Sequence, residues 1–250
     1  MKKLLLAASL ATVLSASVQA DTLLGLYLGG QVWANQSDGV FGDANKQIDF
    51  NLDNEQQGSF YIAIEHPLPL IPNVKISSTT LDTQGKSALT SEFVFNKVTY
   101  KVGDDVNAVF DVSYVDYTFY YEVFDNDLLT FDFGLTARDI SADVKVNSTA
   151  TALTSDISAA GITPMLYVAV NVGLPFTGFN VFAEGNFLSV GDNSFHDYQA
   201  GVSYELVDNL AIDINLTLGY RTINMELDDL DNLSSNIDFN GVFAGAIVHF

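Results

Sequence analysis

Charged residues of both signs recur at the polar positions of alternating segments, and they are the side chains of this chain that could do chemistry. If the segments are β-strands, every second side chain points to the same face, so these groups would gather on one side of a sheet. Acids and bases could neutralise one another in a closed network, or the surplus acids could line a cation-preferring path. The predicted lumen charge network comprises Glu65, Lys75, Asp116, Glu122, Asp132, Arg138, Glu184, Glu205, Asp213 and Arg221.

Catalysis is a third use for such groups. The histidines are His66, His196 and His249, and we expect only His196, with Asp192 and Asp197 nearby, to reach an outer rim. A general base needs its partner within hydrogen-bond reach, which proximity in sequence does not provide. We predict that the chain is not an enzyme and has no catalytic residue. A hydrolase that uses His196 is the remaining alternative.

Carboxylates cluster in segment 226–232 and recur at Asp38, Asp43, Asp104 and Asp105. Hard cations such as Ca²⁺ bind such oxygens, but the spacing does not match an EF-hand loop. We predict a solvated acidic surface, with no metal site and no cofactor. Adhesion, or divalent bridging to lipopolysaccharide, is the alternative. The net charge of −21 argues against nucleic acid as a partner, since phosphates need basic residues.

The first twenty residues have the organisation of a secretory signal peptide. Lys2 and Lys3 precede the apolar run Leu4–Val18, and Ala20 ends a Val-Gln-Ala cleavage site. An uncleaved membrane anchor is the alternative, which the shortness of the run disfavours. We therefore predict residues 1–20 as signal peptide, residues 21–250 as one barrel domain, and export to the cell outer membrane. The absence of cysteine excludes disulfides and thiolate sites.

Strict alternation of apolar and polar residues sets the fold. It is clearest in 212–222, 129–138 and 115–123, where a period of two sends one set to lipid and the other inward. Backbone groups in a bilayer must be paired within the protein, so such strands form closed barrels. The fold class is all-β: a transmembrane antiparallel up-and-down β-barrel of about ten strands. Eight is the alternative, because the strand around Val74 and Ile76 is weak.

The connections alternate between short turns and longer polar segments, as they do in outer-membrane barrels. The longer ones are predicted at 35–57, 82–107, 147–159 and 228–236, and 90–101 could form a hairpin extension. After Arg138 the apolar residues change phase, to Ile140, Ala142, Val144 and Val146. A bulge or the end of the lipid zone would produce this change. We expect the strands to project beyond the membrane.

Several short motifs resemble a known family. They are the Gly29-Gly30 pair within segment 22–33, the turn 66–68, the segment 71–73 and the terminal Phe250. In this order they are similar to the small Gram-negative outer-membrane barrels named for a Gly-Gly in their first strand. The resemblance implies a barrel without an established activity.

These observations predict an integral outer-membrane protein, either a narrow cation-preferring pore or a plugged structural barrel with acidic extracellular loops. Its expected partners are outer-membrane lipids, lipopolysaccharide, periplasmic chaperones and the barrel-assembly machinery. The assembly signal is predicted at Val242, Val248 and Phe250 on the last strand.

Overall fold

The computed structural model describes residues 24–43, 46–68, 70–126, 128–209, 211–230 and 233–250. The predicted signal peptide, residues 1–20, lies outside this part of the chain. Within it, no helix is long and apolar enough to cross a membrane.

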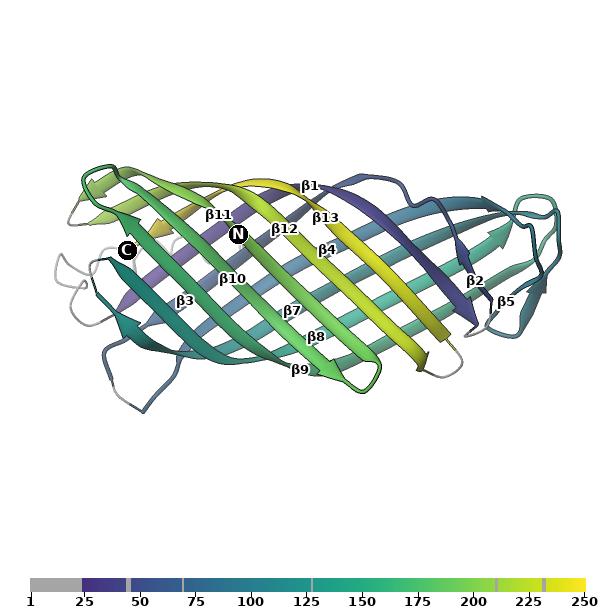
Figure 1. Cartoon of the computed structure of the whole chain (residues 1–250), viewed down its shortest axis with the longest axis horizontal. Helices are drawn as coiled ribbons and strands as arrows, with labels where there is room; N and C mark the ends of the chain where they lie inside the picture. Colours follow the sequence, from purple (N-terminus) through teal and green to yellow (C-terminus); the bar gives the residue numbers. More distant parts are fainter. Residues whose placement is uncertain (1–23, 44–45, 69, 127, 210, 231–232) are drawn as a thin grey trace, which may run out of the picture.

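Ten long strands form a closed antiparallel wall (Figure 1). They are β1 (Gly25–Asp43), β3 (Glu55–Glu65), β4 (Asn73–Ala88), β7 (Asp105–Asp125), β8 (Leu129–Ser148), β9 (Thr154–Leu174), β10 (Phe179–Val190), β11 (Asn193–Asn209), β12 (Ile212–Leu230) and β13 (Leu233–His249). Each pairs with the next, and β13 pairs with β1 to close the wall. The prediction of a ten-stranded antiparallel barrel is confirmed, and the weak strand around Val74 is β4.

In the described part of the chain, three short strands lie outside this wall. The strand β2 (Lys46–Asp49) folds back along the end of β1, while β5 (Phe93–Phe95) and β6 (Val98–Tyr100) pair with each other. The predicted hairpin at 90–101 is therefore the β5–β6 hairpin.

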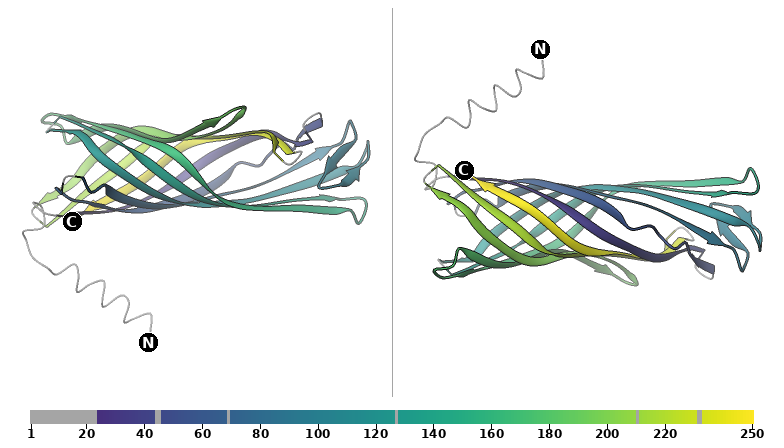
Figure 2. Two further views of the ribbon diagram at one scale, coloured as in Figure 1. Left: turned by 90° about the horizontal axis from the view of Figure 1, so that it is seen from below. Right: turned by 90° about the horizontal axis from the view of Figure 1, so that it is seen from above.

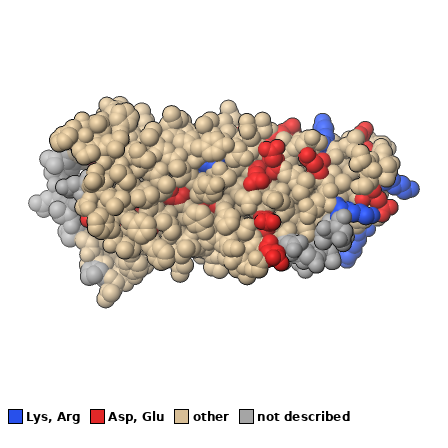
Figure 3. Space-filling model, in the orientation of Figure 1, with Lys and Arg blue, Asp and Glu red and all other residues tan. Residues whose placement is uncertain are grey.

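Apolar side chains cover the outside of the wall over most of its length. Val32, Phe60, Leu135, Leu218 and Val242 are all exposed there. In Figure 3 this part of the visible face carries almost no charged residue, and a band of carboxylates marks where it ends. An apolar band on a closed wall is the surface that faces lipid in outer-membrane barrels. The chain is an integral outer-membrane protein, and both described chain ends lie on the side of the short turns, which is periplasmic in such barrels.

The four predicted long loops are wrong in extent, because strands occupy much of them. β1 continues to Asp43 and β3 begins at Glu55, while β4 continues to Ala88. Residues 149–153 alone connect β8 with β9, while β12 continues to Leu230 and β13 begins at Leu233. Residues 231–232 lie outside the described residues. The segments are polar because their outer face meets water, not because they lack strand structure. Beyond the membrane the strands continue as an extracellular extension.

The phase change after Arg138 marks the end of the lipid zone. β7 and β8 keep one register past Arg138, and the nearest register shift, between Glu122 and Phe124, lies at the other end of the pair. Ile140 and Val144 therefore stay on the lumen side. The interior becomes apolar at the depth where the outer face becomes polar.

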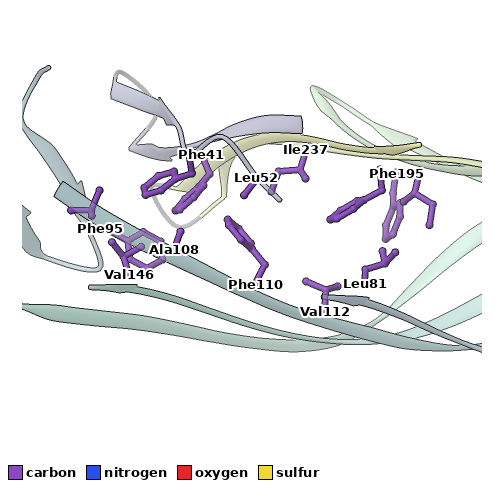
Figure 4. Packing of buried hydrophobic residues seen from close by; sticks show 14 of the residues in the cluster. Phe41, Leu52, Leu81, Phe95, Ala108, Phe110, Val112, Val146, Phe195 and Ile237 are labelled. Carbon is purple, nitrogen blue, oxygen red and sulfur yellow. The ribbon is translucent and has the colours of Figure 1, made fainter. Parts of the chain in front are cut away.

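The apolar interior of this outer half is a continuous cluster, which we call the apolar plug. Phe41 of β1 and Phe110 of β7 meet inside the barrel with ring centroids 4.8 Å apart, although β3 and β4 separate their strands in the wall. Figure 4 shows the rings converging from several strands. The plug comprises Phe41, Phe50, Leu52, Leu81, Leu89, Phe93, Phe95, Tyr100, Val106, Ala108, Phe110, Val112, Val146, Phe195, Ile223, Ile237 and Phe239.

Candidate functional site: a buried arginine layer above a polar chamber

Two arginines and two aspartates cross the lumen beneath the apolar plug. Arg138 Nε and Nη2 donate to the two carboxylate oxygens of Asp116, each at 2.7 Å. Arg221 Nε and Nη2 donate to the two oxygens of Asp197 at 3.0 and 2.9 Å. Arg138 Nη2 also reaches Asp197 Oδ2 at 2.7 Å, and Tyr114 Oη donates to the same oxygen at 2.7 Å. We call these five residues the arginine layer.

Aromatic rings hold the two guanidinium groups in place. Arg138 Cζ lies 3.7 Å from the ring centroid of Tyr114 and 4.6 Å from that of Phe195. Arg221 Cζ lies 5.4 Å from the ring of Trp33. Arginine suits this position because its planar group stacks on rings while its fork binds carboxylates. Arg138 is fully buried, so its charge depends on these partners.

A separate ion pair lies nearer the periplasm. Lys75 Nζ is 2.7 Å from Glu184 Oε2 and 4.5 Å from the ring centroid of Tyr61. Gln199 donates to the other oxygen of Glu184 at 2.8 Å. The ring of Tyr61 lies against Gly29, where an added Cβ would come within 2.0 Å of it. The first glycine of the Gly-Gly pair therefore makes room for this ring.

A chamber of about 440 Å³ extends from the arginine layer toward the periplasm, and Lys75 and Glu184 are part of its lining. Its lining includes Glu65, Glu122, Asp125 and Asp132, and within the described residues none of the four forms an ion pair. Tyr120 Oη donates to Glu65 Oε1 at 2.6 Å. The chamber is thus a polar space with an excess of carboxylates. No buried residue of the apolar plug lines it.

The ten residues predicted as one network fall into three groups. Asp116, Arg138 and Arg221 belong to the arginine layer, and Glu65, Lys75, Glu122, Asp132 and Glu184 line the chamber. Glu205 and Asp213 belong neither to the arginine layer nor to the lining of the chamber. Asp213 instead lies at the periplasmic rim, with Oδ2 3.1 Å from His249 Nδ1, and the His249 ring stacks on Tyr27.

Asp197 and Tyr114 are the two members of the arginine layer that are absent from the predicted lumen charge network. From the sequence, Asp197 is expected near His196 at an outer rim. The alternation that directs Gln199 inward, followed two residues back along the strand, also directs Asp197 inward. His196 lies on the opposite side of β11, with its ring centroid 6.0 Å from that of Phe187. His196 and Asp197 thus point to opposite faces and do not form a catalytic pair. Among the described residues, no group of three or more His, Asp or Glu side chains could hold a metal ion.

Comparisons with known proteins give structural likeness without close relatives. No protein-family model matches the chain, and no curated protein matches it. The outer-membrane protease OmpT of Escherichia coli has a TM-score of 0.49 at 9% identity, covering 90% of this chain and 96% of that one. Neisserial surface protein A has a TM-score of 0.32 at 13% identity, covering 90% and 97%. Ail of Yersinia pestis has a TM-score of 0.36 at 11% identity, covering 91% and 99%.

The family resemblance stays a prediction, because no family model matches. The assignment to the outer membrane follows from the closed wall and its apolar outer band.

Proposed function

We propose that the chain is a non-conducting outer-membrane barrel that holds its β-sheet extension at the cell surface. The observation that carries this proposal is the apolar plug, which lies between the arginine layer and the extracellular side. Leu81 and Phe239 are at most 1% exposed and Phe110 is 3% exposed, although all three point into the lumen. Strands β1, β4, β7, β8, β11, β12 and β13 all contribute to the plug.

A plug of this kind opposes ion flow for two reasons. Apolar constrictions exclude water, and an ion that enters one loses its hydration shell. Barrels of about eight strands have lumens that side chains can fill, and ten strands lie close to that size. The chamber ends at the arginine layer, so it is closed on its extracellular side.

A narrow cation-preferring pore is the second candidate. The four unpaired carboxylates of the chamber favour it, because they would concentrate cations at the periplasmic entrance. For conduction, however, side chains of the plug would have to move aside.

Single-channel recording from refolded residues 21–250 in a planar bilayer, under a salt gradient, separates the two candidates. We expect no discrete current steps from protein whose β-barrel circular dichroism spectrum shows it to be folded. Cation-selective steps in the wild type, with selectivity reduced by Glu122→Gln, would reject the plugged barrel and establish the pore. Glu226→Gln, on the exposed outer face, is the control for a change in charge alone.

A further inference from the structure

Within the described residues, one edge of β9 has no neighbouring strand beyond the membrane. β9 pairs with β8 from Thr154 to Val172, but with β10 only from Leu166 to Leu174. The β10–β11 hairpin bends away from β9 and ends closer to the membrane than β9 does, as both views of Figure 2 show. Continuing the register from the pair of Leu166 with Phe187 would place Val190, the end of β10, opposite Thr163. Residues 157–162 therefore extend past the end of that hairpin.

The backbone of this edge is oriented for strand pairing. Gly173 N donates toward β8, to Leu128 O at 2.9 Å, so the odd-numbered residues of β9 bond to β8. The even-numbered residues then direct their N–H and C=O groups away from β8. Consistent with this, the Asp156 carbonyl accepts a bond from Asn96 Nδ2 at 2.6 Å. Ser158, Ala160 and Ile162 thus present a row of donors and acceptors to solvent.

Both ends of the row are protected, but its middle is not. Asn96 covers Asp156 at the upper end, and Pro164, which lacks an N–H, occupies the lower end. Native proteins block free edges with proline, lysine or bulges. Between these ends, residues 157–163 contain none of these and no charge, and residues 158–162 are all exposed. The edge is open to one additional strand.

The surroundings select the charge of that strand. On the outer face, Asp139 stands opposite Ile162 and Asp143 opposite Ser158, while Asp111 follows Asp143 on the next strand. A strand added to β9 would lie two strand spacings, about 10 Å, from these β8 carboxylates. That distance is close to the screening length at physiological salt, so the carboxylates would act on its side chains.

We propose that the β9 edge docks an extended, positively charged polypeptide segment, which adds to the sheet as a further strand. Backbone hydrogen bonds to Ser158, Ala160 and Ile162 hold the segment, and Asp139 and Asp143 select basic side chains. This inference takes from the proposed function only that β9 projects from the membrane. Probe binding tests the inference and conductance tests the plug, so either can fail alone.

The test uses the full mature chain in nanodiscs of zwitterionic lipid and a fluorescent octapeptide of alternating lysine and valine, capped at both ends. A second octapeptide has the same side chains but is N-methylated on both edges, which removes every backbone donor for strand pairing while keeping the charge. Anisotropy should show that the N-methylated probe binds at least about tenfold more weakly. A tenfold change in affinity corresponds to the loss of roughly one to one and a half net hydrogen bonds. Equal binding of both probes would mean attraction by charge alone and would overturn the proposal.

A pair of variants tests the site on the protein. Ala160→Pro removes the amide at the centre of the edge, whereas Ala160→Thr keeps the amide and suits a strand. We expect Ala160→Pro to weaken the probe about tenfold and Ala160→Thr to leave it unchanged. Wild-type affinity in a folded Ala160→Pro variant would reject the site. A concentration-dependent dimer that Ala160→Pro abolishes, without probe binding, would identify a second copy as the occupant and reject the cationic segment.

Discussion

Arg138 of β8 and Asp197 of β11 are joined across the lumen at 2.7 Å, although β9 and β10 separate their strands in the wall. Asp197 also binds Arg221, so one carboxylate serves two buried guanidinium groups. The arginine layer therefore ties non-adjacent strands together at the base of the plug. Asp197 is the carboxylate that both arginines share.

Replacing Asp197 with Asn should destabilise the barrel by about 3–5 kcal/mol, because it leaves buried positive charge without its partner. Urea unfolding of the refolded protein in detergent measures the change. Asp192→Asn, in the exposed β10–β11 turn, is the control and should stay within about 0.5 kcal/mol of wild type. Equal stability of the two variants would contradict a structural role for the layer.

Opening the plug should create a leak. The double change Phe41→Ala and Phe110→Ala removes two rings that meet inside the lumen and leaves a cavity there. Each Phe→Ala change in a core costs about 3–5 kcal/mol, so folding must be verified first. Bilayer recordings should then show current that the wild type lacks. Phe119→Ala is the control, because it removes a lipid-facing ring from β7, the strand of Phe110, and should produce no current.

The two glycines of the Gly-Gly pair should differ in tolerance. A Cβ at Gly29 would strike the Tyr61 ring at 2.0 Å, whereas at Gly30 the nearest atom is 3.9 Å away. Gly29→Ala should therefore cost about 1–3 kcal/mol, the range for an overpacked interior, and Gly30→Ala much less. Thermal unfolding of both variants measures the difference. Restoration of Gly29→Ala stability by Tyr61→Leu would identify the ring as the cause.

The extracellular extension should gain stability as the pH falls. Asp82 and Asp111 stand directly opposite each other on β4 and β7. Burial, and then the charge of Asp111, raises the pKa of Asp82 above its usual value of 3.8. A carboxyl with a raised folded-state pKa destabilises the fold while ionised, and protonation relieves this.

Asp82→Asn should consequently raise the melting temperature at pH 7, and the gain should shrink as the pH approaches 3.8. Asp53→Asn, which also removes an exposed carboxylate of the extension, is the control. A gain that is the same at every pH would rule out charge as its origin.

The last residue should matter for assembly into the membrane. Phe250 exchanges two backbone bonds with Leu26, with N···O distances of 2.9 and 3.3 Å, next to the closing pair of β1 and β13. Its deletion should lower the amount of folded barrel at the cell surface while export to the periplasm continues. Surface labelling and fractionation measure both. Val242→Ala and Val248→Ala test the rest of the predicted signal, and Leu218→Ala, also lipid-facing but on β12, is the matched control.

The alternation of apolar and polar residues determined the barrel, its antiparallel order and the side of each strand that Lys75, Arg138 and Arg221 occupy. It could do so because the period of two is a local property of a strand. The phase change after Arg138 left a bulge and the end of the lipid zone as alternatives, and the continuous register of β7 and β8 decided for the second.

Only the tertiary structure decided how these side chains meet. Register and barrel closure bring Asp197 to Arg138 and Arg221, separate Glu205 and Asp213 from them, and direct His196 away from Asp197. Closure also fills the outer half of the lumen with Phe41 and Phe110, and the early end of β10 leaves one edge of β9 without a partner strand in the part of the chain that the structure describes. Such contacts join residues far apart in the chain, and their distances depend on strand length, stagger and side-chain volume together, which no local pattern encodes.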